Sequence, residues 1–402
     1  MANQLTKAEV ARRAEASEAR VTELVELGII APRSGDLPFG EGDVTRIRLV
    51  DELEANGVPP TQVAAAIKQG DLSLSYLDRL PGPTPRSNRT YGELCQAQGL
   101  SFEQLCRVFE GFGLARPQPT EHVREDDLAI IDGLPILTEA GLGEAEILRA
   151  ARVWGEGARR VAQHQVHSFH ELIEEPFRRM GMTDDQALDA ALTKIGVRLI
   201  PFCGQLLAWL WRRHFEAFST EHRVGHIETA LDAAGIHRRP AQHQDACVFA
   251  DLSGYTSLTD ARGDTAAADM ALRLGELVQD VASDHGGRVV KLIGDAVHFI
   301  FHDPASAVLG SLDLVDRTAD QGLPPAHVGA NAGPMTYIDG DYYGLAVIVA
   351  ARIAEQAGPG QVLVGESMAT DGGPKGVRFE DAGSLTLKGL GRRVRTFRAM
   401  RA

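Results

Sequence analysis

Two aspartates that follow apolar stretches form the pattern best suited to chemistry in this chain of 402 residues. Asp251 lies in CVFADLSGYTSL (residues 247–258), and Asp295 lies in VVKLIGDAVHFIF (residues 289–301). Apolar, β-branched runs of this length, broken by glycine and aspartate, predict buried strands. A helical stretch at residues 265–283 would cross between them and place the carboxylates side by side. Because Mg²⁺ is held by one or two carboxylates together with substrate phosphates, the pair indicates metal-dependent nucleotide chemistry. The alternative is two strand-terminal acids that face solvent.

The residues around both aspartates resemble two motifs of the class III nucleotidyl cyclases, F-x-D-[IL]-x-G-[FY]-T and K-x-x-G-D. The matching positions are Phe249, Asp251, Leu252, Gly254, Tyr255 and Thr256 in the first motif, and Lys291, Gly294 and Asp295 in the second. Three later stretches follow in the family's order and resemble its next strand and turn, its late catalytic segment and its C-terminal strand: VGANAGPM (residues 328–335), GDYYGLAVIVAARI (residues 340–353) and SLTLKGLGRRV (residues 384–394). The resemblance spans residues 245–397.

This resemblance implies an adenylate cyclase that converts ATP to 3′,5′-cyclic AMP and pyrophosphate with two Mg²⁺ or Mn²⁺ ions per site. The implied metal ligands are Asp251, Asp295 and the backbone carbonyl of Leu252. The turn that leads from the first strand towards the following helix is expected to bind phosphate oxygens through its backbone amides. The substrate-binding residues expected in this turn are Ser253, Gly254, Tyr255 and Thr256.

The resemblance also implies a homodimer, because in this family one chain gives a site its metal-binding acids and the other gives the base-selecting and transition-state residues. Lys291 and Asp341 match the positions that contact adenine, a combination that marks ATP rather than GTP. Arg352 matches the residue that stabilises charge in the transition state. Ile348 departs from the family's V-N-x-A-[AS]-R segment, since isoleucine cannot replace the hydrogen bond of asparagine. Two hypotheses stay open: a regulated adenylate cyclase, and a degenerate cyclase that binds ATP as a signalling module.

The composition limits what the chain is expected to bind. A net charge of −14 argues against broad capture of DNA or of an anionic membrane, because phosphate contacts need clustered lysine and arginine. The most apolar stretch, residues 197–218, is interrupted by polar residues and falls short of the roughly 20 apolar residues that a bilayer span needs, so we expect no membrane partner. Four cysteines without metal-binding spacing predict reduced thiols in a cytoplasmic protein: Cys95, Cys106, Cys203 and Cys247.

The predicted fold class is α+β, with an all-helical N-terminal regulatory region followed by a cyclase domain of ferredoxin-like βαββαβ type at residues 240–402. In that domain, we expect strands at residues 246–251, 288–294, 298–301, 327–330 and 361–365, and helices at residues 265–283, 305–320 and 345–357.

The N-terminal region predicts two helical modules, at residues 1–80 and 90–155, joined by an extended connector at residues 81–89. The second module repeats the first with an offset of 84 or 85 residues, which indicates an internal duplication. The matching pairs include Glu9 with Glu93, Gly28 with Gly113, and Gly57 with Gly141.

The first module resembles the MerR-type winged-helix fold, a resemblance that implies DNA binding. However, residues 1–85 contain nine lysines and arginines against thirteen acids, and the candidate recognition helix SEARVTELVELG has three glutamates and one arginine. Recognition helices use basic and amide side chains against phosphate-lined grooves. The composition therefore disfavours DNA binding and favours a protein-interaction scaffold.

The sequence pattern of residues 156–239 predicts a third helical segment, which is rich in histidine and has a regulatory or linking role. Within it, we expect residues 197–218 to form a buried core helix or a subunit interface, with a lipid-binding groove as the alternative. Eight of the thirteen histidines fall within residues 164–243, and histidine titrates between pH 5 and 8. The arrangement resembles bacterial adenylate cyclases that respond to pH through a helical N-terminal region, which implies the proton as a regulator.

Overall fold

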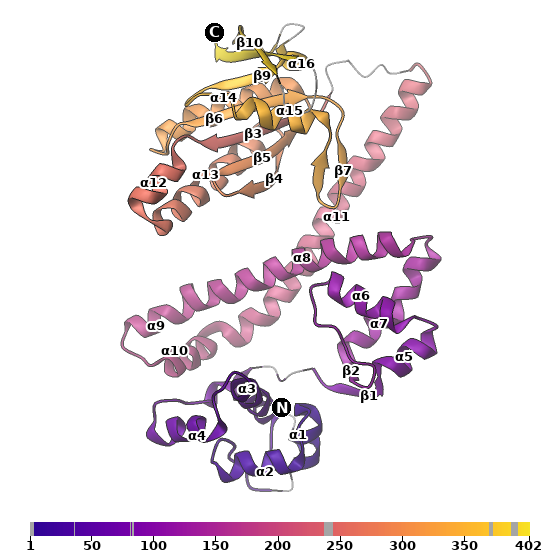
Figure 1. Ribbon diagram of the computed structural model, residues 1–402, viewed down its shortest axis with the longest axis vertical. Coiled ribbons are helices and arrows are strands. Elements are labelled where there is room, and N and C mark those ends of the chain that lie inside the picture. Colours follow the sequence, from indigo (N-terminus) through magenta and orange to yellow (C-terminus); the bar gives the residue numbers. More distant parts are fainter. Residues whose placement is uncertain are drawn as a thin grey trace. The chain divides into compact units, whose positions relative to one another are not determined.

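The computed structural model describes residues 4–35, 37–80, 82, 84–236, 244–369, 373–386 and 393–402. The chain divides into two compact units, Met1–Ser219 and Thr220–Ala402 (Figure 1). The first unit is mainly helical and the second contains the large sheet. The predicted division into a helical N-terminal region and a mixed region of helices and strands is therefore present.

The first unit begins with two helical modules. The first module contains α1 (Lys7–Ala14), α2 (Glu18–Glu26), α3 (Glu41–Ala55), α4 (Pro60–Gln69) and the short 3₁₀ helix η1 (Ser75–Arg79). The second contains α5 (Tyr91–Gln98), α6 (Phe102–Gly111), α7 (Glu125–Glu139) and the start of α8 (Glu144–Phe169). Each module has its own core, the first around Leu24 and Ile47, the second around Leu94 and Leu105.

The two modules repeat the same helix-starting chemistry. Thr6 accepts a hydrogen bond from the backbone of Glu9, whose side chain binds back to the Thr6 amide, and Thr90 and Glu93 form the same reciprocal cap 84 residues later. Such a cap satisfies two amides that a helix leaves unpaired at its start. Glycines with positive φ also keep the offset: Gly28 (φ 76°) with Gly113 (φ 75°), and Gly57 (φ 87°) with Gly141 (φ 89°). The predicted duplication therefore extends to backbone conformation, while the MerR-type resemblance stays a prediction.

Two features of the first unit differ from the sequence expectation. Part of the expected connector forms β1 (Arg86–Thr90), which pairs antiparallel with β2 (His122–Arg124). A sheet was not expected here, because neither segment is apolar enough to give a strand pattern. In addition, α8 continues without a break through the predicted module boundary near residue 155.

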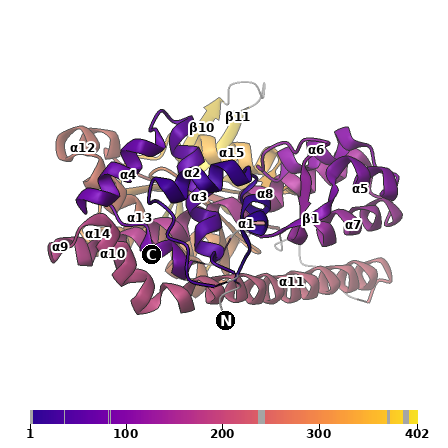
Figure 2. The ribbon, with the colours of Figure 1, turned by 90° about the horizontal axis from the view of Figure 1, so that it is seen from below.

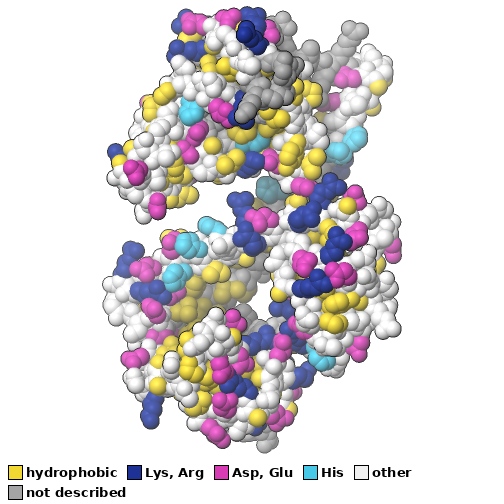
Figure 3. Space-filling view, viewed as in Figure 1, with side chains coloured by type: hydrophobic (Ala, Val, Ile, Leu, Met, Phe, Trp, Pro, Cys, Tyr) yellow, Lys and Arg dark blue, Asp and Glu magenta, His cyan; other side chains and the backbone are white. Residues whose placement is uncertain are grey.

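The acidic character of α2 is visible in its ion pairs. The guanidinium of Arg20 lies 3.0 Å from Glu23 and 2.7 Å from Asp51, and it also binds Glu54. Figure 3 shows basic and acidic side chains intermingled over this unit on the face in view, without a single basic surface. The one arginine of the candidate recognition helix is thus already bound to acids.

The remaining helices of the chain's first half are η2 (His170–Glu174), α9 (Glu175–Arg179), α10 (Asp184–Ala191), η3 (Leu192–Gly196) and α11 (Val197–Ala233), where η2 and η3 are π-helical turns. As expected, residues 144–236, all of which the structure describes, contain no strand.

The expectation of a buried core helix at residues 197–218 is wrong for the single chain. α11 is a long helix (Figure 2) whose large apolar side chains are largely exposed, including Phe202, Trp209, Trp211 and Phe215. Among the residues that the structure describes, no other element covers these side chains. Its role as a subunit interface stays a prediction. Within the described residues no single helix is long and apolar enough to cross a bilayer, although the bent pair Asp184–Gly196 and Arg198–Ala233 meets that test jointly by length and composition.

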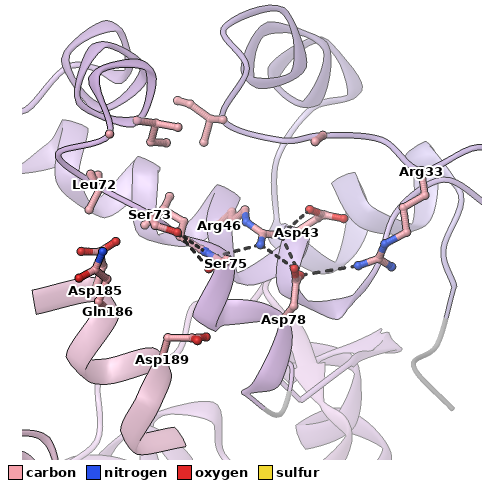
Figure 4. Close-up of a pocket in the computed structure, with 15 residues that line it drawn as sticks. Arg33, Asp43, Arg46, Leu72, Ser73, Ser75, Asp78, Asp185, Gln186 and Asp189 are labelled. Carbon is pink, nitrogen blue, oxygen red and sulfur yellow. Dashed lines mark hydrogen bonds and ion pairs between the residues drawn. The ribbon is translucent and has the colours of Figure 1, made fainter. Parts of the chain in front are cut away.

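A cavity of about 590 Å³ lies between the first module and α10 (Figure 4). On one side, the buried guanidinium of Arg46 bonds Asp43 (2.7 Å), Asp78 (2.9 Å) and the carbonyl of Leu74 (3.0 Å). The opposite rim carries three polar residues of α10, namely Asp185, Gln186 and Asp189. The buried ion pairs fix η1 against α3 and so hold this side of the cavity in place.

The second unit contains a seven-stranded sheet in the order β10-β11-β9-β6-β3-β5-β4. Its strands are β3 (Ala246–Leu252), β4 (Gly287–Ile293), β5 (Ala296–Phe301), β6 (Ala326–Ala332), β9 (Val362–Gly365), β10 (Val377–Thr386) and β11 (Arg393–Arg401). Its helices are α12 (Tyr255–Arg262), α13 (Asp264–Asp284), α14 (Pro304–Asp320), α15 (Leu345–Ala354) and α16 (Glu366–Ala369). Four neighbouring strands at one end of the sheet, β3, β4, β5 and β6, are linked through α13 and α14 and have the predicted βαββαβ connectivity.

Alternation along β3 decides which residues face the site. Ala246, Val248 and Ala250 pack in the main core with α13 and α14, whereas Cys247 packs on the other face with α15. Because side chains alternate between faces, Asp251 lies on the same face as Cys247. α15 approaches the sheet closely: a Cβ on Gly329 of β6 would lie 2.0 Å from the backbone nitrogen of Ala354.

Two sequence expectations for this unit need correction, and one element was missed. The expected C-terminal strand at residues 384–394 is instead the end of β10 and the start of β11, and residues 387–392 lie outside the described residues. α15 ends at Ala354 rather than residue 357, because the chain turns at residues 355–360. A hairpin of β7 (Thr336–Ile338) and β8 (Asp341–Tyr343) was not expected, since three-residue strands give little sequence signal.

Candidate active site

The structure brings the carboxyl groups of Asp251 and Asp295 together. Asp251 stands near the end of β3 and pairs across the sheet with Ala296, so Asp295, in the preceding turn, lies beside it. Burial, a hydrogen bond to Asp251 and the charge of Asp251 raise the pKa of Asp295 to about 6. Two carboxylates this close favour either a shared proton or a cation between them.

The oxygen atoms around this pair suit a hard divalent cation. The amide of Leu252 donates to Oδ1 of Asp251 at 2.9 Å, which orients that carboxylate. Within the described ranges, no group of three or more His, Cys, Asp and Glu side chains could hold an ion. The remaining ligands would therefore be backbone carbonyl, water or phosphate oxygens, as is usual for Mg²⁺. The roles of both aspartates and of the Leu252 carbonyl as metal ligands stay predictions.

His327 is a neighbour of this pair that the sequence reasoning missed. It stands on β6 directly opposite Asp251. Its Nε2 lies 3.7 Å from Oδ2 of Asp251, and its Nδ1 lies 3.2 Å from Oγ of Ser253. Burial lowers the pKa of His327, which favours the neutral ring. Only the register between β3 and β6 reveals this contact, and the sequence alone does not give that register.

The expected phosphate-binding turn leads into the start of α12, but its four residues are not equivalent. Gly254 takes a left-handed conformation (φ 78°) and caps the helix. The amide of Ser253 donates to the carbonyl of Pro325 at 3.0 Å and is already used. The hydroxyl of Tyr255 donates to the carbonyl of Ala267 at 2.9 Å, so this side chain turns away towards the core. The backbone amides of Tyr255 and Thr256, in the first helical turn, remain suited to bind phosphate.

The two residues expected to select the base form an ion pair. Nζ of Lys291, on β4, bonds Oδ2 of Asp341, on β8. The amide of Tyr342 donates to Oδ1 of the same carboxylate at 2.8 Å. Burial opposes ionisation of Asp341, but Lys291 and Tyr342 outweigh it and hold the pKa of this carboxyl below its ordinary value. The hairpin that the sequence did not predict therefore positions one of the predicted site residues.

A histidine on β5 completes this group and was also missed. His298 is fully buried and stands opposite Lys291 across the β4–β5 pair. Its ring stacks on Phe249 with centroids 4.5 Å apart, and its Nε2 lies 3.1 Å from Sγ of Cys247. Because position 298 lies within an apolar strand pattern and outside the two motifs, no sequence feature singled it out.

Arg352 is bound elsewhere than at the carboxylate pair. Its Nη1 lies 2.6 Å and 2.7 Å from the two carboxylate oxygens of Glu355, one turn along the same chain. Ile348 stands one turn before Arg352 on the same face of α15. Both side chains are about half exposed. This face of α15 is thus open in the single chain.

Sequence comparison finds relatives named adenylate cyclase that align with most of the chain. No family model matches. An adenylate cyclase of Streptomyces coelicolor is 30% identical over 297 residues, which cover 73% of this chain and 74% of that protein. A pH-sensitive adenylate cyclase of Mycobacterium tuberculosis is 29% identical over 400 residues, covering 96% of this chain and 93% of that one. Among solved structures, the adenylyl cyclase CyaB from P. aeruginosa is 21% identical with a TM-score of 0.35, covering 40% of this chain and 94% of that chain. That structural score is too low to carry an argument, so the family assignment depends on the sequence relatives.

Proposed function

The chain belongs to the adenylate cyclase family as a bacterial class III cyclase, and from this premise we propose that it converts ATP to 3′,5′-cyclic AMP and pyrophosphate as a homodimer. The observation that carries the proposal is the presence of two chemically distinct half-sites in one unit. Asp251 and Asp295 form an acidic pair, while Lys291 and Asp341 form a separate ion pair. The first suits cations with a triphosphate, and the second suits a purine.

The base half would recognise adenine by matching donors and acceptors. Lys291 donates to a ring nitrogen, and Asp341 accepts a hydrogen bond from the exocyclic amino group. Guanine has a carbonyl oxygen at that position, which the Asp341 carboxylate would repel. The lowered pKa of Asp341 supports this role, because the carboxylate stays ionised and is an acceptor only.

The phosphate half would bind the triphosphate beside the carboxylate pair. Asp251 and Asp295, with the Leu252 carbonyl, would hold two divalent cations, which when bound activate the ribose 3′-hydroxyl and neutralise the leaving pyrophosphate. The amides of Tyr255 and Thr256 would donate to phosphate oxygens and fix their direction. Asp251 is held in orientation by the Leu252 amide.

Arg352 would serve a site formed with a second chain. In the single chain its guanidinium is held by Glu355 and lies on an open face of α15. In a dimer it would instead donate to the negative charge that develops on the α-phosphate in the transition state. The exchange is feasible because Arg352 and Glu355 are both about half exposed, and an exposed pair of this kind is weak.

We further propose that the N-terminal helical region regulates the cyclase unit. The similarity of almost the full chain to a pH-sensitive adenylate cyclase supports the proton as the signal. The duplicated modules have separate cores, and α8 runs from the second module into the segment that follows it, so they would act as a scaffold for this response. The alternative regulator is a lipid, bound in an apolar groove that residues 197–218 would form.

The second candidate function is an ATP-binding signalling module without turnover. Ile348 favours it, because this exposed apolar side chain stands where relatives of the resembled family carry a hydrogen-bonding asparagine. Such a protein would bind ATP through Lys291 and Asp341 but form almost no product.

Assay of the purified full chain distinguishes the two functions. It should be incubated with ATP and Mn²⁺, and then with Mg²⁺, and cyclic AMP and pyrophosphate measured; the same assay with GTP gives the selectivity. An Asp251→Ala chain serves as control for contaminating cyclase. Equal amounts of cyclic AMP from the parent and the control would contradict the catalytic proposal.

A further inference from the structure

His298 has one ring nitrogen without a hydrogen-bond partner in a place where partners are normally required. The side chain is 0% exposed. Its Nδ1 faces Oδ1 of Asp341 at 3.8 Å, beyond hydrogen-bond distance, and has no partner among the described residues. Buried polar atoms are nearly always bonded, and exceptions point to an absent water or ligand or to a second conformation. Here the exception adjoins the group that contacts the base.

The surroundings of the ring decide which nitrogen carries its proton. Burial lowers the pKa of His298 to about 4, so the ring is neutral near pH 7 and has a single N–H. Burial also raises the pKa of the Cys247 thiol above its ordinary value, so the sulfur keeps its proton. A lone pair on Nδ1 would be repelled by the carboxylate of Asp341. The favoured tautomer therefore has its proton on Nδ1, with Nε2 accepting from the Cys247 thiol.

Counting acceptor positions on Asp341 shows what this N–H is suited to do. A carboxylate accepts about four hydrogen bonds, two on each oxygen. Oδ2 binds Lys291, which leaves one position on that oxygen for a ligand. Oδ1 binds the amide of Tyr342 at 2.8 Å and has one position left, directed towards His298. Filling that position from Nδ1 would fix Oδ1 to the protein and present Oδ2 to the base.

We propose that His298 is a positioning residue for adenine recognition. When ATP enters, the Asp341 carboxylate closes onto the Nδ1–H of His298 and forms a hydrogen bond of about 2.9 Å. Its other oxygen, held by Lys291, then accepts from the adenine amino group. The stacked ring of Phe249 and the thiol of Cys247 hold the imidazole in the required plane. The inference rests on the proposed function, because it assigns His298 to the purine side of the same site.

The test compares three substitutions in the full-length chain. His298→Leu removes both ring nitrogens. His298→Asn keeps an N–H donor close to the position of Nδ1. Ile300→Ala is the matched control, because Ile300 is buried on the same face of β5 two residues away, packs in the same cluster as Cys247 and has no polar side-chain atom. For each folded chain, the affinities for ATP and GTP are measured by competition with a fluorescent nucleotide in Mn²⁺, together with kcat and KM for cyclic AMP formation.

His298→Leu should lower the ratio of ATP to GTP affinity by about tenfold or more, the effect expected for losing a hydrogen bond to a charged group. The loss should fall mainly on KM for ATP. His298→Asn should recover most of the selectivity, and Ile300→Ala should change the ratio by no more than about twofold, because it removes no hydrogen bond that distinguishes the two bases. A His298→Leu chain that folds, dimerises and keeps the parental ratio would overturn the proposal.

A measurement on the unsubstituted chain covers the case in which His298→Leu does not fold. In protein labelled with ¹⁵N-histidine, His298 should show a protonated Nδ1 and an unprotonated Nε2, and the Nδ1–H resonance should move downfield when ATP binds. A proton on Nε2, or no response to ATP, would refute the proposal. The binding assay also separates the two claims. A parent chain that binds ATP selectively without making cyclic AMP contradicts only the catalytic function, whereas one that binds neither nucleotide overturns both.

Discussion

The two half-sites of the cyclase unit differ in how far a single chain completes them. At the base half, Lys291 and Asp341 already neutralise each other, and the pKa of Asp341 is lowered. At the phosphate half, Asp251 and Asp295 bring like charges together, and the pKa of Asp295 is raised to about 6. The contrast teaches that side chains of one chain already pair in the proposed base half, whereas the proposed phosphate half would gain its opposite charges from cations and from a partner's arginine.

The largest predicted effect tests whether the phosphate half and the base half of one chain contribute to two different sites of the dimer. Asp251→Ala and Lys291→Ala should each reduce cyclic AMP formation to background, because one removes a metal ligand and the other a base contact at every site. Mixing the two chains should restore activity, since a heterodimer rebuilds one intact site from unmutated halves. The measurement is cyclic AMP formation by the separate and mixed chains.

A chain that carries both substitutions is the matched control, because every site in its homodimer lacks both the metal ligand and the base contact. Heterodimer formation is verified with two different affinity tags. An inactive mixture in which heterodimers are present would contradict the shared-site arrangement and remove the basis of the comparison.

Arg352→Ala should lower kcat by about 10²–10³-fold with a smaller change in KM, the usual result of losing a group that stabilises transition-state charge. Glu355→Gln is the control, since it releases the same guanidinium from its partner and should leave kcat unchanged or raised. Steady-state kinetics on both variants decide the matter. Similar losses in the two variants would mean that the Arg352–Glu355 pair acts as a structural unit.

His298 in the base half and Asp295 in the phosphate half should respond to acid with opposite signs. The folded pKa of His298 is about 4, below its ordinary value of 6.5, so its contribution to stability is complete above pH 6.5 and is lost as the pH falls towards 4. Between pH 7.5 and pH 5, this loss amounts to about 2 kcal/mol of unfolding free energy. Asp295 has a raised pKa, so it favours the folded state at low pH and loses that effect as the pH rises through about 6.

Urea denaturation in the presence of a chelator measures both contributions. His298→Leu should flatten the decline in stability between pH 6.5 and pH 5, whereas Asp295→Asn should steepen it. If both variants keep the parental pH dependence, other groups control the acid response of this unit.

The smallest predicted effect concerns Ile348. Ile348→Asn should raise kcat more than tenfold and change KM less, because an added donor beside Arg352 would act mainly in the transition state. Kinetics of the folded, dimeric variant provide the test. A parent that already turns over rapidly and gains nothing would indicate that another group supplies the contact. A parent and variant that both bind ATP and form almost no product would favour the signalling-module hypothesis.

The sequence predicted those parts of the fold and site that depend on local patterns. Apolar runs located β3, β4 and β5, and turn residues located Asp251 and Asp295 at their ends. Residues brought in by strand register could not be found in this way: His327 meets Asp251 only through the β3–β6 pairing, and His298 meets Lys291 only through β4–β5.

The sequence also could not predict whether an apolar helix is buried within its own chain. Hydrophobicity predicts that α11 should be covered, but it cannot say whether the cover comes from the same chain. Trp211 and Phe215 stack on each other at 5.4 Å between centroids and remain exposed in the single chain. The sequence therefore identified this helix correctly as apolar, but the prediction that it lies in the core of the chain was wrong.

The separate cores of the repeated modules have a consequence for the order in which the chain folds. Helices α1, α2 and α3 pack together within about fifty residues, so this core can form while the rest of the chain is still being synthesised. β3, in contrast, cannot pair on both edges until β6 has been made, some eighty residues later. Nascent protein should thus pass through a state with folded helical modules and an exposed, unpaired β3. During translation, that strand is where we expect aggregation to start and chaperones to bind.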